Sequence, residues 1–531
     1  MAKREERAVS TSEELIGLIC GRLHLHDGSG LLMDLEGTNA PAFDKLVGEL
    51  GPSEAFAQLA AACWYDDAQL VSSVAGAASL AHGHADVHRV GIYYRTLGTG
   101  GAERITLDTA RLWRSMGIEV TLLCDEGHAG SLDLEGEGIA VAELPSCLSP
   151  DPATQRRRPS ALYEALSSRG IQALVYCQWL SPTLGWDLLA THMAGASFIV
   201  FTHGTTRVLT GYQNPPDLRF PAMYRHADGV VCLSAEDQRF WSTFNGAVHR
   251  TVNKCDEAFF AQPTAPLRGH RVAWVGRVSQ DKTPLEMLDV LAHLRREVPD
   301  ATLALMGPFG DCPLEQYRAR AQELGVWDAV EVLGDVAHHE LPEQLAAADL
   351  VVFTSHMEGY PVALAEAKAA GLPCAMYDLA HLTLLEGGRG VLTAPIGDTL
   401  ALAHQAARLL ADKDLARAMG ADARSHAREL QDFDLTVFWR TVLAAPSGAA
   451  CDPLQNGAGV ACALFEAGQA QLGARNVCDD LRSQLDQERH ARGELEGVLA
   501  DVTGSVSFKA GRAITAPLRG LRDAFGHAKK D

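Results

Sequence analysis

Short apolar runs alternate with helix-like segments twice along this chain, and this alternation restricts the fold more than any other feature of the sequence. Runs such as HRVGIYY from His88 and RVAWVGR from Arg271 have the length and the β-branched content of buried strands. Glycine-rich or polar turns follow them, and then segments with helical spacing. Strands that alternate with helices predict a parallel sheet covered on both faces. We therefore predict an α/β protein with two doubly wound, Rossmann-like domains.

The alternation is interrupted near Pro263, Pro266 and Gly269, a composition typical of a linker. FDLTVFWRTVL, after the second alternation, predicts a helix that packs back across both domains. The predicted parts are, in order, a helical N-terminal extension (1–86), a first Rossmann-like domain (87–256), a second Rossmann-like domain (270–430), a crossing helix (431–445), and a linker, polar helix and basic amphipathic tail (446–531).

Composition excludes several classes of protein. The 531 residues carry a formal net charge of −21, which argues against a general nucleic-acid binder with its basic face. The 12 cysteines are scattered without a C-x-x-C pair, so we expect reduced thiols in a cytoplasmic protein. The N-terminus has no signal-peptide core, and no apolar run approaches the length of a spanning helix.

The C-terminal tail has a pattern of its own. Residues 505–531 mix apolar side chains such as Phe508 and Leu518 with basic ones such as Lys509 and Arg519. A basic amphipathic segment can lie on an anionic membrane, and a solvated terminal helix is the other interpretation. We expect peripheral contact with the inner face of the plasma membrane if the first interpretation holds.

The segment Asp349–Gly371, DLVVFTSHMEGYPVALAEAKAAG, predicts a buried strand, a turn and a helix. Pro361 suits the first helical position, where its missing N–H costs little. Glu358 should then lie in the loop after the strand, and Glu366 about one turn into the helix. In open α/β sheets this edge binds ligands. Two carboxylates near a helix N-terminus suit a ligand that carries hydroxyls and phosphate, although solvated surface charges would give the same pattern.

Two other loops occupy corresponding places. Gly276-Arg277-Val278-Ser279-Gln280-Asp281-Lys282 follows the first strand of the second domain, and Arg277 and Lys282 are suited to grip one anion from its two ends. Gly98-Thr99-Gly100-Gly101-Ala102-Glu103-Arg104 follows the first strand of the first domain, and its glycines allow a backbone to approach phosphate. Each loop is a weak signal when it is taken alone.

Together the three motifs resemble the retaining glycosyltransferases of family 4 (glycosyltransferase group 1), which have the GT-B fold. That family carries a Gly-Gly-Ala-Glu-like turn, a Gly-Arg…Lys loop and a Glu-x7-Glu element, here Glu358 to Glu366. The resemblance covers residues 88 to 430 in the correct order. It implies a nucleotide-sugar donor held mainly by the second domain, a hexosyltransferase reaction with retention, and no resident cofactor.

The resemblance also assigns roles to residues of this chain. The implied catalytic set is Arg277 and Lys282 on the diphosphate, Glu358 on the hydroxyls of the transferred sugar, and His203 near that sugar. The implied donor-binding set is Gly100, Gly101, Gly276, Gly359, Tyr360 and Glu366, with Glu366 on the ribose and Gly100 and Gly101 on the diphosphate. On this assignment the two glutamates hold the donor rather than move protons.

The chain departs from the family pattern at two points. Pro361 stands where many members have a residue with an N–H, so one backbone donor to the sugar is absent. Asn253-Lys254-Cys255-Asp256 replaces the family's Asn-Gly-Val-Asp, which makes a left-handed turn less easy. Neither departure touches the charged residues.

No Asp-x-Asp occurs in a strand-end loop where it would hold a divalent ion on the diphosphate. We therefore expect no metal, with Arg277 and Lys282 stabilising the leaving diphosphate. The resemblance implies same-face attack, in which a donor phosphate oxygen takes the acceptor's proton. The expected acceptor is a glycan or a lipid-linked saccharide in bacterial cell-surface polysaccharide or glycoconjugate synthesis, partly because Ala516-Pro517-Leu518-Arg519 looks like the tails of some such enzymes.

Two rival functions remain open at this point. A non-catalytic GT-B subunit of another glycosyltransferase would have the same fold, although the intact charged set argues against it. A GT-B epimerase or phosphorylase would bind different ligands, inorganic phosphate among them for a phosphorylase.

Overall fold

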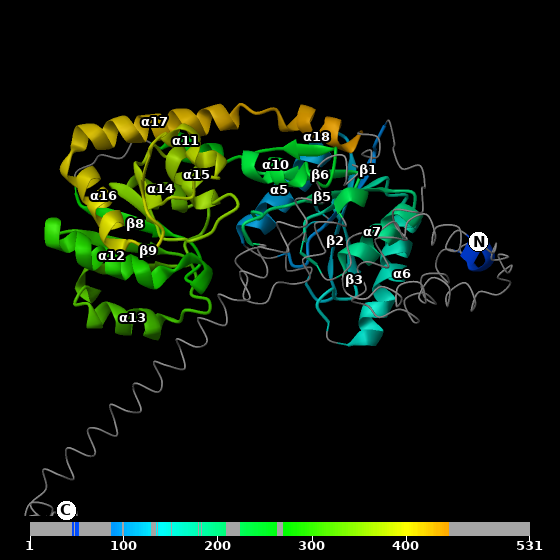
Figure 1. The fold of residues 1–531 in the computed structure, drawn as a ribbon, viewed down its shortest axis with the longest axis horizontal. Coiled ribbons are helices and arrows are strands. Elements are labelled where there is room, and N and C mark those ends of the chain that lie inside the picture. Colours follow the sequence, from blue (N-terminus) through cyan, green and yellow to red (C-terminus); the bar gives the residue numbers. More distant parts are fainter. Residues whose placement is uncertain are drawn as a thin grey trace, which may run out of the picture. The chain divides into compact units, whose positions relative to one another are not determined.

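The computed structural model of the chain describes residues 86–444 apart from several short gaps, together with 45–46 and 48–51 (Figure 1). The gaps are 98–99, 129–133, 135, 150, 179, 182, 209–223 and 263–268. Nearly all of the predicted N-terminal extension, and all of the predicted tail with residues 505–531, lie outside the described residues.

A parallel sheet of seven strands forms the first domain in the described part of the chain. Its spatial order is β3-β2-β1-β4-β5-β6-β7, so the chain builds outward from β1 in both directions. The strands are β1 (Arg89–Tyr93), β2 (Glu119–Asp125), β3 (Ala140–Leu144), β4 (Ala173–Tyr176), β5 (Ser197–Phe201), β6 (Gly229–Cys232) and β7 (Val248–Arg250). The connecting helices are α5 (Gly101–Ser115), α6 (Pro152–Arg169), α7 (Leu184–Met193) and α10 (Ala235–Trp241), with a 3-10 turn at Tyr224–His226.

A second parallel sheet, of six strands, forms the other domain, in the order β10-β9-β8-β11-β12-β13. Its strands are β8 (Arg271–Val275), β9 (Thr302–Met306), β10 (Val330–Gly334), β11 (Leu350–Phe353), β12 (Cys374–Tyr377) and β13 (Val391–Ala394). Its helices are α12 (Pro284–Glu297), α13 (Leu314–Glu323), α14 (Leu341–Ala346), α15 (Val362–Ala369), α16 (Thr399–Ala411) and α17 (Lys413–Gln431), with 3-10 turns at Gln280–Lys282, Trp327–Ala329 and Thr383–Gly388.

Alternate residues of the second sheet pack on opposite faces, as helices on both sides require. Val272 and Trp274 of β8 join a core cluster with Met287 of α12, whereas Ala273 joins a different cluster with Leu364 of α15. Successive side chains of a strand point to opposite faces, so both faces are buried. The predicted pair of doubly wound parallel sheets is confirmed.

Three further elements complete the described part of the chain. The predicted linker contains a short helix, α11 (Glu257–Ala261), because Phe259 and Phe260 are buried in the core instead of solvated. The crossing helix is α18 (Leu435–Leu443), whose Trp439 packs edge-on against Trp113 of α5 at 5.0 Å between ring centroids. Short β7 was not predicted, since three half-exposed residues give no apolar run.

A buried ion cluster joins the carboxyl ends of three strands in the first sheet. Arg158 Nη1 donates to Asp125 Oδ1 at 3.0 Å, and Arg158 Nε donates to Asp187 at 3.0 Å. The hydroxyls of Tyr93 and Tyr176 donate to these carboxylates at 2.7 and 2.6 Å. Buried charges are tolerated when they are paired and hydrogen-bonded in this way. The cluster fixes the edge of the sheet from which the predicted site loops leave.

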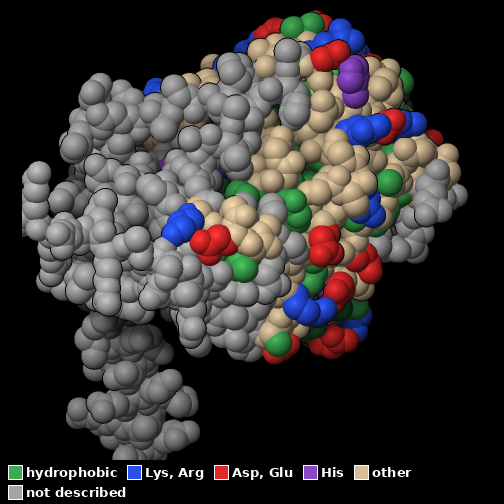
Figure 2. Space-filling model, turned by 90° about the vertical axis from the view of Figure 1, so that its right-hand side faces the viewer, with side chains coloured by type: hydrophobic (Ala, Val, Ile, Leu, Met, Phe, Trp, Pro, Cys, Tyr) green, Lys and Arg blue, Asp and Glu red, His purple; other side chains and the backbone are tan. Residues whose placement is uncertain are grey.

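No helix of the described residues is long and apolar enough to cross a bilayer. On the face drawn in Figure 2, the acidic and basic side chains of the described residues lie beside one another. The expectation that the partner is not a nucleic acid stays a prediction.

Candidate functional site

The loop between β11 and α15 carries the first glutamate of the predicted pair. β11 is completely buried, and the chain turns through Glu358, Gly359 and Tyr360 into the helix. Pro361 is the residue before the helix, with φ −69° and ψ 102°, and Val362 is the first helical residue. The helix thus begins at Val362, and Pro361 is the residue that caps it rather than its first residue. A proline in this extended conformation still ends the loop sharply, because its φ is fixed.

Lys282 and Glu358 form a direct ion pair. Lys282 Nζ donates to Glu358 Oε1 at 2.6 Å, although 76 residues separate them in the chain. Lys282 follows β8, and Glu358 follows the neighbouring strand β11. The carboxyl ends of adjacent parallel strands meet at one edge, which explains the contact. The predicted diphosphate cation and the predicted sugar-binding carboxylate are thus held together.

Thr283, next to Lys282, has an unusual backbone conformation. Its φ of 43° is the only positive value among the described non-glycine residues. A β-branched residue in this region stores strain, which the surrounding structure must hold in place. The Thr283 hydroxyl donates to the Thr354 carbonyl, Thr354 Oγ1 donates to the Lys282 carbonyl at 3.1 Å, and Trp274 Nε1 donates to Thr354 Oγ1 at 3.0 Å. This network fixes the backbone that presents Lys282.

Glu366 lies inside α15 and is paired across the two domains. Arg104 Nη2 of α5 donates to Glu366 Oε1 at 2.6 Å, and His338 Nε2 lies 3.0 Å from the same oxygen. The Glu366 side chain is only 4% exposed, whereas Arg104 is 30% exposed. A buried carboxylate needs such partners. Glu366 therefore faces the first domain, as the predicted cleft requires.

Arg104 and His338 were not among the predicted site residues. Arg104 had a readable signal, because a cation in the first turn of a helix opposes the helix dipole. A cation at this position is stabilised when a nearby carboxylate pairs with it, as Glu366 pairs with Arg104. His338 had no comparable signal, since it lies in a polar loop, HHE, between β10 and α14.

The turns of the two domains approach each other closely. A Cβ on Gly359 would lie 2.6 Å from the carbonyl oxygen of His203, and a Cβ on Gly101 would lie 3.5 Å from the Val362 side chain. Gly359 therefore allows the loop after β11 to touch the loop after β5. Gly101 places the N-terminus of α5 against the N-terminus of α15. Two helix N-termini that converge in this way create positive potential for an anion.

His203 follows β5, and its ring packs against aromatic neighbours. The centroid of Phe201 lies 4.0 Å from that of His203, and Tyr94 lies edge-on at 6.1 Å. Nε2 is enclosed without a hydrogen-bond partner among the described residues. Burial lowers the pKa of His203 to about 3. The imidazole is therefore neutral at pH 7 and available for a hydrogen bond but not as a cation.

The remaining predicted residues take different positions. Tyr360 is buried, and its hydroxyl donates to the Asn253 carbonyl at 2.9 Å, so its side chain is engaged within the protein. Gly276 approaches the next turn so closely that a Cβ on Gly307 would lie 1.9 Å from the Gly276 oxygen. Gly100 immediately precedes α5 and is exposed.

Arg277 is exposed, and its Nε donates to Ser279 Oγ at 3.3 Å. Burial and the Glu103 carboxylate raise the pKa of Tyr94, while Arg277 acts against that rise. Among the described residues, the guanidinium forms no ion pair with a carboxylate.

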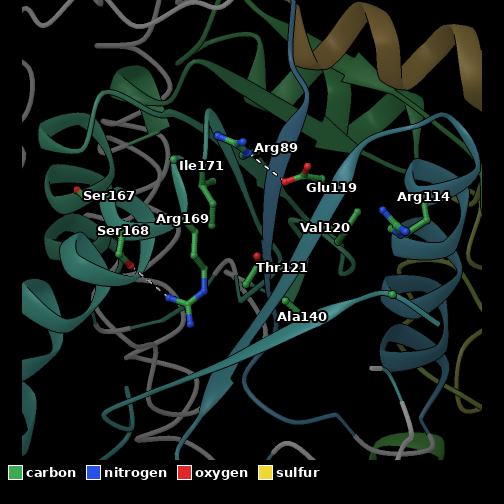
Figure 3. Close-up of a pocket in the computed structure, with 12 residues that line it drawn as sticks. Arg89, Arg114, Glu119, Val120, Thr121, Ala140, Ser167, Ser168, Arg169 and Ile171 are labelled. Carbon is green, nitrogen blue, oxygen red and sulfur yellow. Dashed lines mark hydrogen bonds and ion pairs between the residues drawn. The ribbon is translucent and has the colours of Figure 1, made fainter. Parts of the chain in front are cut away.

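A pocket of about 720 Å³ opens at the opposite edge of the first sheet, where β1, β2 and β3 begin (Figure 3). Arg89 at this pocket donates to Glu119 at 3.0 Å. Arg114 and Arg169 stand in the last turns of α5 and α6, and Arg169 Nη1 donates to the Ala165 carbonyl at 3.3 Å. Cations are favoured at helix C-termini. We interpret these arginines as structural, and an anionic ligand there would face the negative ends of two helices.

The described residues contain no cluster of three or more histidines, cysteines or carboxylates suited to a metal ion. The expectation that the reaction needs no metal stays a prediction. The ion pairs Lys282–Glu358 and Arg104–Glu366 lie in the loops and helices near the N-termini of α5 and α15. Charged side chains and helix N-termini of this kind are suited to bind a ligand that is both anionic and rich in hydroxyls.

Two family models match the chain along both domains. Residues 256–426 match the glycosyl transferases group 1, and residues 100–253 match the glycosyl transferase 4-like domain.

Several known proteins are similar in sequence. An exopolysaccharide phosphotransferase of Streptomyces coelicolor is 30% identical over 229 residues, which are 42% of this chain and 23% of that protein. The D-inositol 3-phosphate glycosyltransferase of Corynebacterium jeikeium is 31% identical over 30% of this chain and 40% of that protein. The D-inositol 3-phosphate glycosyltransferase of Nocardia farcinica is 27% identical over 55% of this chain and 69% of that protein. The chain thus spans less than half the length of the first two of these relatives.

Solved structures share the architecture at low identity. Anabaena Alr3699/HepE in complex with UDP and glucose has a TM-score of 0.54 at 19% identity, over 65% of this chain and 96% of that chain. The sucrose-phosphate synthase of Thermosynechococcus elongatus has a TM-score of 0.54 at 18% identity, over 72% and 100%. These likenesses support the GT-B arrangement of the two sheets. The second domain thus matches the glycosyl transferases group 1, and the first domain matches the glycosyl transferase 4-like domain.

Proposed function

We propose that this protein is a retaining glycosyltransferase that moves a hexosyl group from a nucleotide-sugar donor to a glycan or lipid-linked acceptor. The observation that carries the proposal is the convergence of Lys282, Glu358, Arg104 and Glu366 beside the facing N-termini of α5 and α15. A nucleotide-sugar has a diphosphate between two polyols, and this site has two cations, each paired with a carboxylate.

The proposed reaction exchanges one bond at the anomeric carbon of the donor sugar. The bond from the anomeric carbon to the diphosphate oxygen breaks, and the acceptor oxygen bonds to the same face of that carbon. The acceptor's proton moves to a donor phosphate oxygen, so a nucleoside diphosphate leaves. Negative charge grows on the diphosphate in the transition state, and fixed cations stabilise it there more than in the ground state. Arg277 and Lys282 supply these cations in the proposal.

In the proposal, binding of the donor rearranges the ion pairs of the site. In the proposal, Lys282 turns from Glu358 toward the diphosphate, and Glu358 accepts from hydroxyls of the sugar. Glu366 exchanges Arg104 or His338 for the ribose hydroxyls. Each exchange replaces one charge-assisted hydrogen bond with another, so no carboxylate is left buried without a partner.

The cellular role in the proposal is synthesis of cell-surface polysaccharide or glycoconjugate at the cytoplasmic face of a bacterial membrane. The similarity to an exopolysaccharide phosphotransferase and to D-inositol 3-phosphate glycosyltransferases supports such a setting. The structural neighbour solved with UDP and glucose makes UDP-sugars the first donors to test.

A donor panel tests the proposal. Purified protein is heated with UDP-, GDP- and ADP-sugars and with inorganic phosphate, and donor hydrolysis is measured with the ligand that stabilises most. A specific ligand at 100 times its Kd should add about 2.7 kcal/mol to the free energy of unfolding. Hydrolysis or transfer from one nucleotide-sugar supports the enzyme. Binding without turnover favours the non-catalytic subunit, and stabilisation by phosphate alone favours a phosphorylase.

Substitution of the two cations tests their role. Arg277→Ala and Lys282→Ala should each lower kcat by about 100-fold or more, the usual cost of removing one preorganised charge from a transition state. Circular dichroism should show the wild-type fold. Arg417→Ala is the matched control, because the ion pair of Arg417 among the described residues is with Asp414 on an exposed helix turn. Wild-type turnover by either site variant would overturn the diphosphate assignment.

A further inference from the structure

One lysine of the second domain is buried away from the proposed donor site. Lys368 lies on α15, two residues after Glu366, and is 0% exposed. Nζ donates to the carbonyl of Leu384 at 2.6 Å and to the carbonyl of Arg389 at 2.9 Å, and lies 2.7 Å from His426 Nδ1. An ammonium has three N–H donors, and here it meets three acceptors. Such a group is costly to bury, so its presence needs a reason.

Both carbonyls belong to the loop between β12 and β13. Gly387, Gly388 and Gly390 of this loop have positive φ of 74°, 68° and 74°. These left-handed residues curl the chain so that carbonyl oxygens converge on Nζ. A Cβ on Gly390 would lie 2.3 Å from the Cβ of Ala423 on α17, so the loop is pressed against that helix.

The other side of the same loop touches the donor site. His381 Nε2 lies 2.8 Å from the backbone carbonyl of Glu358, and because a carbonyl only accepts, Nε2 is the donor. Thr383 Oγ1 donates to the Leu233 carbonyl of the first domain at 2.7 Å. The loop therefore joins the backbone of Glu358 to the first domain.

We propose that Lys368 is a positioning residue that sets the Glu358 loop for donor binding through the β12–β13 loop and His381. The chain of contacts runs from Nζ to the carbonyls of Leu384 and Arg389, through that loop to His381, and then to the Glu358 carbonyl. This inference rests on the proposed function, since it assigns Glu358 to the donor sugar.

Burial lowers the pKa of Lys368 to about 8, and the charges of Arg389, Asp422 and Glu429 act on it as well. Burial also lowers the pKa of His426 to about 4, and Lys368 adds to that effect. At pH 7 the lysine is therefore mostly an ammonium and the histidine is neutral, which matches the direction of their hydrogen bond. A methionine at position 368 would fill a similar volume without a donor.

Calorimetry and hydrogen exchange with the full chain test the inference. Lys368→Met should raise the Kd for the stabilising nucleotide-sugar about tenfold, roughly the effect of one hydrogen bond lost in positioning a binding group. It should also speed amide exchange in 356–361 and 379–390. If Lys368 has only a structural role, some Lys368→Met molecules will be unfolded and will not bind. Calorimetry would then give fewer binding sites per chain and an unchanged Kd. Lys413→Met makes the same chemical change at an exposed lysine and should leave both readouts unchanged.

A double-mutant cycle provides the decisive comparison. His381→Ala should raise Kd by a similar factor, and Lys368→Met with His381→Ala should cost no more than either change alone, because both act along one route. Fully multiplicative effects would overturn the inference. If Lys368→Met does not fold, wild-type Kd in His381→Ala overturns it instead.

Failure of the proposed function gives a different result. If wild-type protein binds no nucleotide-sugar, the donor assignment is wrong, and exchange in 356–361 still decides whether Lys368 positions that loop. Unchanged exchange there in Lys368→Met would overturn the positioning role itself.

Discussion

At the scale of single residues, the candidate site is a set of charge pairs whose partners belong to distant parts of the chain. Glu366 is held by Arg104 and His338, and Glu358 by Lys282. A buried carboxylate is tolerated when it is paired, and removal of its partner destabilises the fold because an uncompensated charge stays buried. These pairs therefore hold the two glutamate side chains in place at the candidate site.

The proposed ribose contact gives a residue-scale prediction. Glu366→Ala should weaken nucleotide binding by about ten- to a hundredfold, because hydrogen bonds to a charged group are worth about 1.5–3 kcal/mol. Calorimetry with the free nucleotide isolates this effect from the sugar. Glu343→Ala removes an exposed carboxylate of α14 and serves as control. Equal nucleotide affinity in Glu366→Ala and wild type would contradict the ribose role.

At the scale of elements, glycines and one strained threonine decide how the loops meet. Gly359 and Gly101 allow close approach between the domains, and Thr283 adopts a φ of 43° beside Lys282. The sequence placed all of these loops at strand ends correctly. It did not reveal the strain at Thr283, because that conformation is imposed by contacts with Thr354 rather than favoured by the residue itself.

Helix α18 offers an element-scale test. Trp439 is buried against Trp113 and Phe201, with ring centroids at 5.0 and 5.8 Å. Trp439→Ala should lower the free energy of unfolding by about 3–5 kcal/mol, the usual cost of emptying such a site. Urea denaturation measures it. Val437→Ala on the same helix is the control, since Val437 is 58% exposed. A decrease in the free energy of unfolding as small as that of the control would show that Trp439 contributes little to the core around Trp113 and Phe201.

At the scale of the whole molecule, buried histidines link stability to pH. Burial lowers the pKa of His203 to about 3 and that of His426 to about 4. Between those values and 6.5 the unfolded chain binds more protons than the folded one, so stability falls as pH falls through that window. Each histidine contributes a slope of up to about 1.4 kcal/mol per pH unit.

Urea unfolding at pH 7.5, 6.0 and 5.0 measures this dependence. The free energy of unfolding should decrease at each step downward. His426→Gln can still accept from Lys368 and should flatten the curve, whereas His404→Gln at an exposed site should not. A wild-type curve that stays level from pH 7.5 to 5.0 would contradict the assignment of neutral buried histidines.

The sequence by itself determined the two parallel sheets and the loops at their carboxyl edges. Strand and helix periodicity are local, and the burial of both sheet faces leaves short apolar runs that can be read directly. The three motifs could be located for the same reason. Their order along the chain was enough to suggest the glycosyltransferase group whose model residues 256–426 match.

Only the tertiary structure decided which charges meet. Arg104 and Glu366 are 262 residues apart, and Lys282 and Glu358 are 76 apart, so no local pattern connects them. Lys368 reads in sequence as an ordinary helical lysine, yet it is fully buried by carbonyls that three left-handed glycines turn inward. The physical reason is that pairing depends on distance in space, and a side chain's partner is set by how loops from separate domains pack.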